Sequence, residues 1–206
     1  MAATLLAFLG ASFLLAVAPG PTTALLLRQV LRAGRRATFL TIAGSQTGLL
    51  CWSIAAACGL SALLSASEAA YTALRIGGAL VLLALGMQSL RGRGGRAVRH
   101  EPPGADAAGI GAFRIGLLTE AANPKAAVFA LAFLPGFVPA GAPVLPTMLL
   151  LGVLWVAVDA AWYVALTTLL HGARERLLQT GLRRRLEQLS GLVLIGIGAS
   201  LALERR

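Results

Sequence analysis

Long apolar runs are the feature that most restricts how this chain can fold. Most of them exceed the ~20 residues that an α-helix needs to cross the hydrocarbon of a bilayer, and the last is near the ~17-residue minimum. Hydrophobic residues make up 57% of the 206 residues and charged residues only 13%, whereas a soluble domain has roughly a quarter charged residues. The sequence therefore predicts an all-α, polytopic membrane protein with six transmembrane helices, in the runs 4–27, 38–64, 69–90, 114–138, 146–170 and 187–203.

The basic residues are concentrated between alternate apolar runs. The formal net charge is +10, and 14 of the 18 lysines and arginines lie in or beside the first, third and fifth connecting segments. Because lysine and arginine accumulate in cytoplasmic loops, this pattern predicts that these segments are cytoplasmic and that the N- and C-termini lie outside. Orientation explains the charge and leaves no basic surface with interleaved aromatic residues, so nucleic-acid binding is not expected.

A segment rich in Gly, Arg and Pro, residues 91–112, divides the chain into two halves. Because it has no helical apolar period, it predicts a cytoplasmic linker. We expect a single transmembrane domain over 1–206, with one three-helix half at 1–90 and a second at 113–206. The first half would start outside and the second inside, so structural similarity between them would be an inverted repeat.

The first helix of each half carries a proline-containing break. The first break is the PGP of residues 19–21, and the second is the NPK of residues 123–125. Proline removes a backbone donor and clashes with the preceding turn, so each break frees carbonyls that lipid cannot satisfy. Paired broken helices in corresponding positions indicate the binding site of a transporter, and we expect these two to meet near the bilayer midplane.

Three ionisable residues lie within the apolar runs: Glu120, Lys125 and Asp159. Placing one such charged side chain at the bilayer centre costs about 2.5 to 3.5 kcal/mol, so each of the three requires a bonding partner or a water-filled cavity. Glu120 and Lys125 flank the second break and could form either part of a binding site or a purely structural ion pair, and Lys125 could also snorkel along its helix. Asp159 has no base nearby in its own helix, so we expect its partner on another one.

Several other residues are expected to be structural. Trp155, Trp162 and Tyr163 share the helix face of Asp159, where interfacial anchoring is the favoured interpretation. The GxxxG of Gly44 and Gly48 predicts close helix packing and is compatible with a homodimer, and further glycines recur at Gly77, Gly78, Gly191, Gly196 and Gly198. Cys51 and Cys58 share one helix face and are expected to be small buried residues.

No catalytic or cofactor motif is present. The two histidines, His100 and His171, lie in or beside predicted cytoplasmic loops, and there is no H-E-x-x-H, no G-x-S-x-G and no metal-ligand spacing. We therefore expect neither an enzyme nor a resident cofactor or metal. A non-transporting membrane scaffold or assembly factor remains as the alternative to a transporter, because broken helices can also serve packing alone.

Three segments together resemble the lysine-exporter (LysE/RhtB) family of amino-acid efflux proteins: APGPTTALLLRQVLRAGRRA, GLLTEAANPKAAVFALAFLPGFV and VDAAWYVAL. The resemblance covers nearly the whole chain and implies a six-helix carrier of the bacterial inner membrane. Such a carrier would export amino acids or related metabolites, with protons as the coupling ion. By position, it implies binding residues at Pro19, Gly20, Pro21, Asn123, Pro124, Lys125 and Asp159.

The chain departs from the family pattern at three positions. Thr22 follows PGP where members often have Asn or Asp, Leu49 stands where many have an acid, and Glu120 stands where Asn is usual. We add Thr22 and Glu120 to the candidate site, since an acid absent at 49 and present at 120 suggests that the titrating group has moved. The resulting hypothesis is that Glu120 or Asp159 carries the proton and that Lys125 tunes it. Lysine-like, threonine- or homoserine-like, branched and non-amino-acid substrates all stay open.

Overall fold

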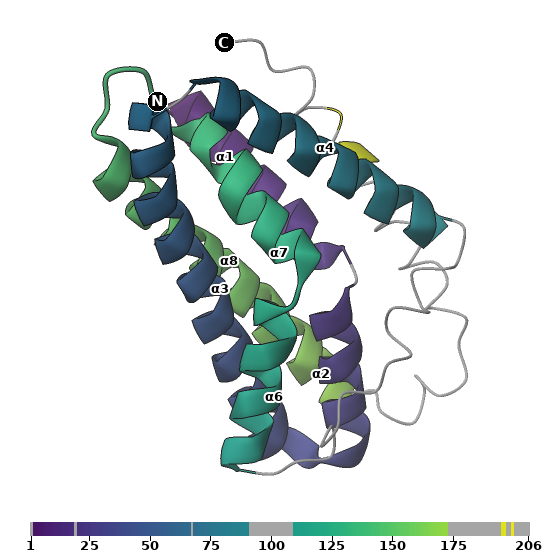
Figure 1. Ribbon diagram of the computed structural model, residues 1–206. Helices are drawn as coiled ribbons and strands as arrows, with labels where there is room; N and C mark the ends of the chain where they lie inside the picture. Colours follow the sequence, from purple (N-terminus) through teal and green to yellow (C-terminus); the bar gives the residue numbers. More distant parts are fainter. Residues whose placement is uncertain are drawn as a thin grey trace.

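The computed structural model describes residues 2–18, 20–66, 68–90, 109–172, 195, 196 and 199. Within these residues every regular element is a helix, which confirms the all-α prediction. Pro19, most of the linker (91–108) and almost all of the sixth apolar run lie outside the described residues. The described elements form one bundle whose two broken helices run beside long continuous ones (Figure 1).

The first apolar run folds as two helices, α1 (Ala2–Val17) and α2 (Pro21–Arg32). Their axes bend by 54° at the PGP break. Pro21 occupies the first turn of α2, where the missing N–H is not needed. The helix continues beyond the apolar run to Arg32, and the turn at Ala33 with Gly34 at φ 82° leads directly into the next helix. The basic residues of this connection therefore lie largely on helix ends.

The second broken helix comprises α6 (Ile110–Ala121) and α7 (Pro124–Val128), followed by the π-helical η1 (Phe129–Phe133) and the 3₁₀-helical η2 (Leu134–Phe137). The bend at NPK is 52°. Here Pro124 opens α7, and the side chain of Asn123 accepts a hydrogen bond from the backbone N–H of Lys125 at 3.1 Å. The Asn-Pro pair thus ends one helix and caps the next.

Three continuous helices complete the bundle: α3 (Gly34–Ala66), α4 (Glu68–Leu90) and α8 (Val144–Gly172). Gly34–Gly59 and Val144–Gly172 are long and apolar enough to cross a membrane, and each broken pair adds one span if it is counted as one. In α4 only the shorter stretch Thr72–Leu85 has the required apolar character. The described residues thus contain two to four candidate spans, and the six-helix count and the inverted repeat stay predictions.

Glycines let α3 approach α6 and α8 closely. A Cβ added at Gly44 would lie 2.0 Å from the carbonyl oxygen of Phe113, and one at Gly116 would lie 2.1 Å from that of Thr41. On the α8 side, a Cβ at Gly152 would meet the Cβ of Ser53 at 2.6 Å. The packing role predicted for the GxxxG is confirmed, but this face is used inside the chain and is not available to a second copy.

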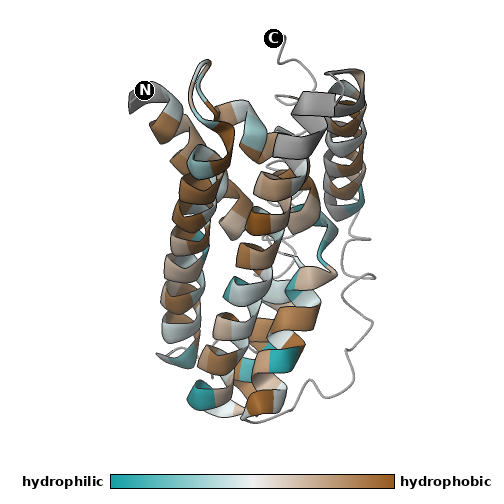
Figure 2. Ribbon diagram, turned by 60° about the vertical axis from the view of Figure 1, so that its left-hand side comes forward, coloured by the Kyte–Doolittle hydropathy of each residue, from teal (hydrophilic) through white to brown (hydrophobic). Residues whose placement is uncertain are grey.

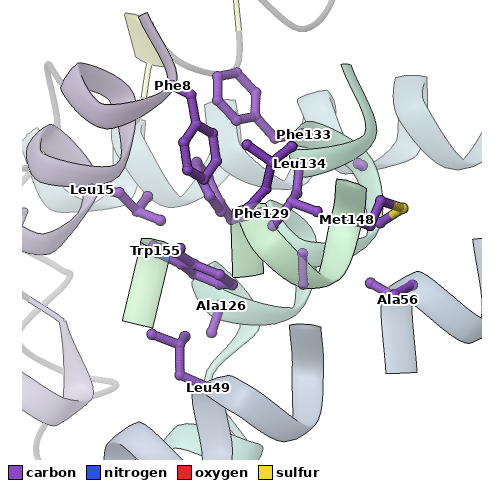
Figure 3. Packing of buried hydrophobic residues seen from close by; sticks show 14 of the residues in the cluster. Phe8, Leu15, Leu49, Ala56, Ala126, Phe129, Phe133, Leu134, Met148 and Trp155 are labelled. Carbon is purple, nitrogen blue, oxygen red and sulfur yellow. The ribbon is translucent and has the colours of Figure 1, made fainter. Parts of the chain in front are cut away.

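An apolar cluster fills the bundle on the α1 N-terminal side of the breaks. Figure 3 shows Phe8 of α1, Phe129 and Phe133 of η1, and Trp155 of α8 converging there. The rings of Phe129 and Trp155 lie 4.6 Å apart between centroids. Trp155 and Tyr163 are 1% and 2% exposed, so the anchoring interpretation is wrong for both. They share the face of Asp159, and that face points into the bundle.

Figure 2 shows that apolar residues predominate along the helices, and many large apolar side chains are exposed, as expected for contact with lipid. Leu6, Leu118 and Leu169 are among the large apolar residues that are mostly exposed. Cys51 and Cys58 are exposed as well, so the prediction that they are buried is wrong. The small-residue face of α3 packs against α6 and α8, which turns the cysteine face outward. In a membrane helix, apolar character alone does not distinguish the two faces.

Candidate substrate site

Lys125 joins the second break to the first. Its ammonium Nζ donates hydrogen bonds to the carbonyl oxygens of Leu15 and Ala18, each at 2.9 Å. These carbonyls belong to the C-terminal end of α1, which the break leaves without helical partners. A Cβ added at Gly20 would lie 3.6 Å from the same Nζ, so glycine leaves this side of the ammonium open. The prediction that the two breaks meet is therefore confirmed, and their position near the bilayer midplane stays a prediction.

Glu120 forms a second connection between the breaks. Its Oε2 accepts a hydrogen bond from the hydroxyl of Thr22 in the first turn of α2, and its Oε1 accepts from the amide of Asn123 at 3.1 Å. The carboxyl group is buried, with the residue 4% exposed. Trp52 of α3 donates its indole N–H to the backbone carbonyl of Glu120 at 3.3 Å. The C-terminal end of α6 is thus held by hydrogen bonds from Thr22, Asn123 and Trp52.

The charged groups at the second break are bonded to neutral partners in the described part of the chain. Lys125 is held by backbone carbonyls, and Glu120 is held by a hydroxyl and an amide. This arrangement differs from the simple ion pair that was one alternative from the sequence. The lysine is 7% exposed and reaches into the bundle, so snorkelling is excluded. The same hydrogen bonds therefore stabilise the buried charges of Glu120 and Lys125 and the backbone at the two breaks.

Asp159 lies in the middle of α8 and faces α3. It is 7% exposed, and its Oδ2 accepts a hydrogen bond from Nε2 of Gln46 at 2.8 Å. The expectation that its partner comes from another helix is confirmed. That partner is an amide rather than a base, and sequence reasoning missed it. Gln46 lies between the two glycines of the GxxxG, where a long polar side chain inside an apolar run was the available signal.

The comparisons with known proteins decide the family. A family model described as LysE type translocator matches residues 4–205. This chain belongs to the LysE type translocator family. It is 30% identical over 199 residues to a homoserine/homoserine lactone efflux protein of Salmonella typhimurium, covering 97% of this chain and 96% of that protein.

Two further relatives are similar to this chain. A threonine efflux protein of Escherichia coli is 30% identical over 115 residues, which is 55% of this chain and 56% of that protein. An uncharacterized membrane protein of Bacillus subtilis, YrhP, is 23% identical over 207 residues, covering 97% of this chain and 99% of the relative. No solved structure matches. The resemblance seen in the sequence is confirmed, and membership of this family makes the chain a multi-pass membrane protein related to efflux proteins.

Two of the three positions at which we expect a departure from the family pattern are in contact. Thr22 and Glu120 bond to each other across the breaks. Leu49 is buried in the apolar cluster. It directly follows Gly48, and a Cβ added at Gly48 would lie 3.0 Å from the Cβ of Glu120. Gly48, which precedes Leu49 in the chain, therefore packs against Glu120.

Proposed function

We propose that this LysE translocator exports amino acids or closely related metabolites across the bacterial inner membrane in exchange for protons. The observation that carries the proposal is the meeting of two broken helices at the buried groups of Thr22, Glu120 and Lys125, in a chain from a translocator family. The relatives named for homoserine and threonine efflux support an amino-acid substrate.

A zwitterionic substrate needs groups of both signs, and the candidate site supplies them. On the positive side are Lys125 and the first turn of α2, which begins after Gly20 without a side-chain cap. Helix N-termini bind anionic groups through their free N–H groups and dipole. On the negative side are Glu120 and Asp159. We infer that Pro19, Gly20 and Pro21, together with Asn123 and Pro124, shape this site by breaking the helices.

The distribution of buried side chains supports a direction of access. Aromatic residues close the bundle on the α1 N-terminal side, which the basic residues predict to be outside. Buried polar residues continue on the opposite side, along α2 and the first part of α3: Thr22, Gln29, Thr38, Thr41 and Ser45. Because these polar residues are buried in this conformation, we propose that the aromatic cluster seals the outside and that the substrate enters from the polar, cytoplasmic side when the helices there move apart.

Proton coupling is energetically sufficient. One elementary charge moving down 100 mV releases about 2.3 kcal/mol, which supports roughly a fifty-fold gradient of a neutral solute. A single membrane carboxyl that alternately binds and releases a proton would provide the coupling. Glu120 and Asp159 are the candidates for that group.

Counterflow in proteoliposomes tests the proposal. Purified protein is reconstituted with each of a panel of unlabelled amino acids inside, and uptake of the same radiolabelled amino acid is followed. We expect protein-dependent uptake for at least one amino acid, absent from empty vesicles. Absence of uptake for every amino acid, with protein that melts cooperatively in detergent, would favour the scaffold alternative.

The same vesicles test coupling. Proton-driven efflux and equilibrium exchange are compared for Glu120→Gln, Asp159→Asn and Lys125→Met. Neutralising the proton-carrying acid should abolish proton-driven efflux, and substrate exchange should persist if that acid does not also bind the substrate. If both acid variants keep wild-type proton-driven efflux, neither acid is the coupling group.

A further inference from the structure

The two buried acids of the candidate site have different surroundings. Both carboxylate oxygens of Glu120 accept hydrogen bonds, from Thr22 and from Asn123, and these partners lie at the two breaks. Asp159 accepts one hydrogen bond at Oδ2, from Gln46. A carboxylate offers about four lone-pair positions, so Asp159 keeps acceptor capacity. Glu120 is engaged in holding the broken helices together.

The residue that bonds to Asp159 carries a polar atom without a partner. Oε1 of Gln46 is buried and has no hydrogen-bond partner among the described residues. Most buried polar groups in folded proteins are hydrogen-bonded, so exceptions call for an explanation. A ligand that binds at Asp159 would provide one.

The orientation of the Gln46 amide follows from the charge beside it. Only its N–H group can face an ionised carboxylate, so Oε1 points away from the Asp159 Oδ2 contact. The pair then offers a carboxylate with acceptor capacity beyond its bond to Gln46, and an amide oxygen that has no donor among the described residues. An ammonium group, with three N–H donors and a positive charge, is the ligand chemistry that fits them.

We propose that Gln46 and Asp159 together bind the amino group of the transported substrate, and that Glu120 instead holds the two broken helices in register. The inference rests on the proposed amino-acid export and narrows the substrates to molecules with a primary ammonium group. Gln46 contributes one acceptor directly and orients the carboxylate that contributes the other. The carboxyl end of the substrate would then lie toward Lys125 and the start of α2.

The test compares an amino acid with its 2-hydroxy acid, which has nearly the same shape but no ammonium group. Counterflow first identifies a transported amino acid. If none is transported, the proposed function fails, and the failure is separate from the selectivity test. With a transported amino acid, exchange is then inhibited by increasing concentrations of the unlabelled amino acid or of the hydroxy acid. The ratio of the two inhibition constants measures recognition of the amino group.

We expect Gln46→Met to reduce this ratio roughly tenfold, since a hydrogen bond to a charged group is lost. Gln46→Glu keeps an acceptor toward the substrate and should preserve the preference for the amino acid. Thr47→Val alters the neighbouring exposed threonine, whose hydroxyl bonds to Ala43 of its own helix, and should change neither transport nor the ratio. Glu120→Gln should slow transport and lower thermal stability without changing the ratio.

Two results would overturn the assignment. One is a wild-type ratio in Gln46→Met, and the other is loss of the preference in Glu120→Gln. If Gln46→Met does not fold, Gln46→Glu decides: a retained preference supports the pair, and a lost preference contradicts it. The ratio is the critical readout, because a residue with a structural role alone would alter the rate for both compounds equally.

Discussion

Replacing Lys125 with methionine tests whether this side chain stabilises the end of α1. The ammonium donates to the carbonyls of Leu15 and Ala18, each at 2.9 Å, and methionine offers no donor. A buried acceptor left without a partner costs about 1–3 kcal/mol, so two such carbonyls cost roughly 2–6 kcal/mol. Loss of the buried charge removes its desolvation cost, which offsets part of this. We therefore expect a net destabilisation at the lower end, about 2–3 kcal/mol.

Thermal unfolding in detergent, followed by tryptophan fluorescence, measures this effect. A loss of 1 kcal/mol lowers Tm by about 2–4 °C in a chain of this size, so we expect a decrease of about 4 to 12 °C. Thr168→Val is the control. It removes a single hydrogen bond between an exposed threonine and Val164 of the same helix, and should melt close to the wild type.

Lys125→Arg separates the loss of the donor from the change of shape. It keeps a charged donor at this position, so we expect its Tm to lie between those of the wild type and Lys125→Met. If Lys125→Met melts within the range of Thr168→Val, the two hydrogen bonds do not stabilise the break. The role of the lysine would then be confined to transport.

Three further predictions concern packing and topology. Gly44→Ala should destabilise the protein by about 1–3 kcal/mol or more, because its Cβ would overlap a backbone carbonyl; Gly77→Ala, where an added Cβ meets nothing within 4 Å, should be neutral or stabilising in the same melts. Trp155→Ala should cost about 3–5 kcal/mol through the cavity it leaves in the aromatic cluster, and a change below 1 kcal/mol would contradict its burial. Single cysteines at Gly94 and Ala140, in an otherwise cysteine-free chain, should react with an impermeant reagent in intact cells at 140 but not at 94, and the opposite pattern would reverse the proposed orientation.

The sequence alone determined the class of protein and the position of the breaks. Long apolar runs require a membrane, because hydrocarbon is the solvent that such surfaces tolerate, and a proline in the interior of a helical run kinks or breaks the helix. The resemblance in the PGP and NPK segments was sufficient to predict the family, which the comparisons confirm. These features are local, and each depends on the properties of a short segment.

Only the tertiary structure decided which residues meet. Gln46 and Asp159 are far apart in the sequence and belong to different helices, so no spacing along the chain relates them. Burial of Trp155 and exposure of Cys51 could not be predicted either, because an apolar membrane helix can turn the same side chains toward lipid or toward the bundle. Rotation of each helix is set by close contacts such as those of Gly44 and Gly116, and these exist only after helices from distant parts of the sequence have packed together.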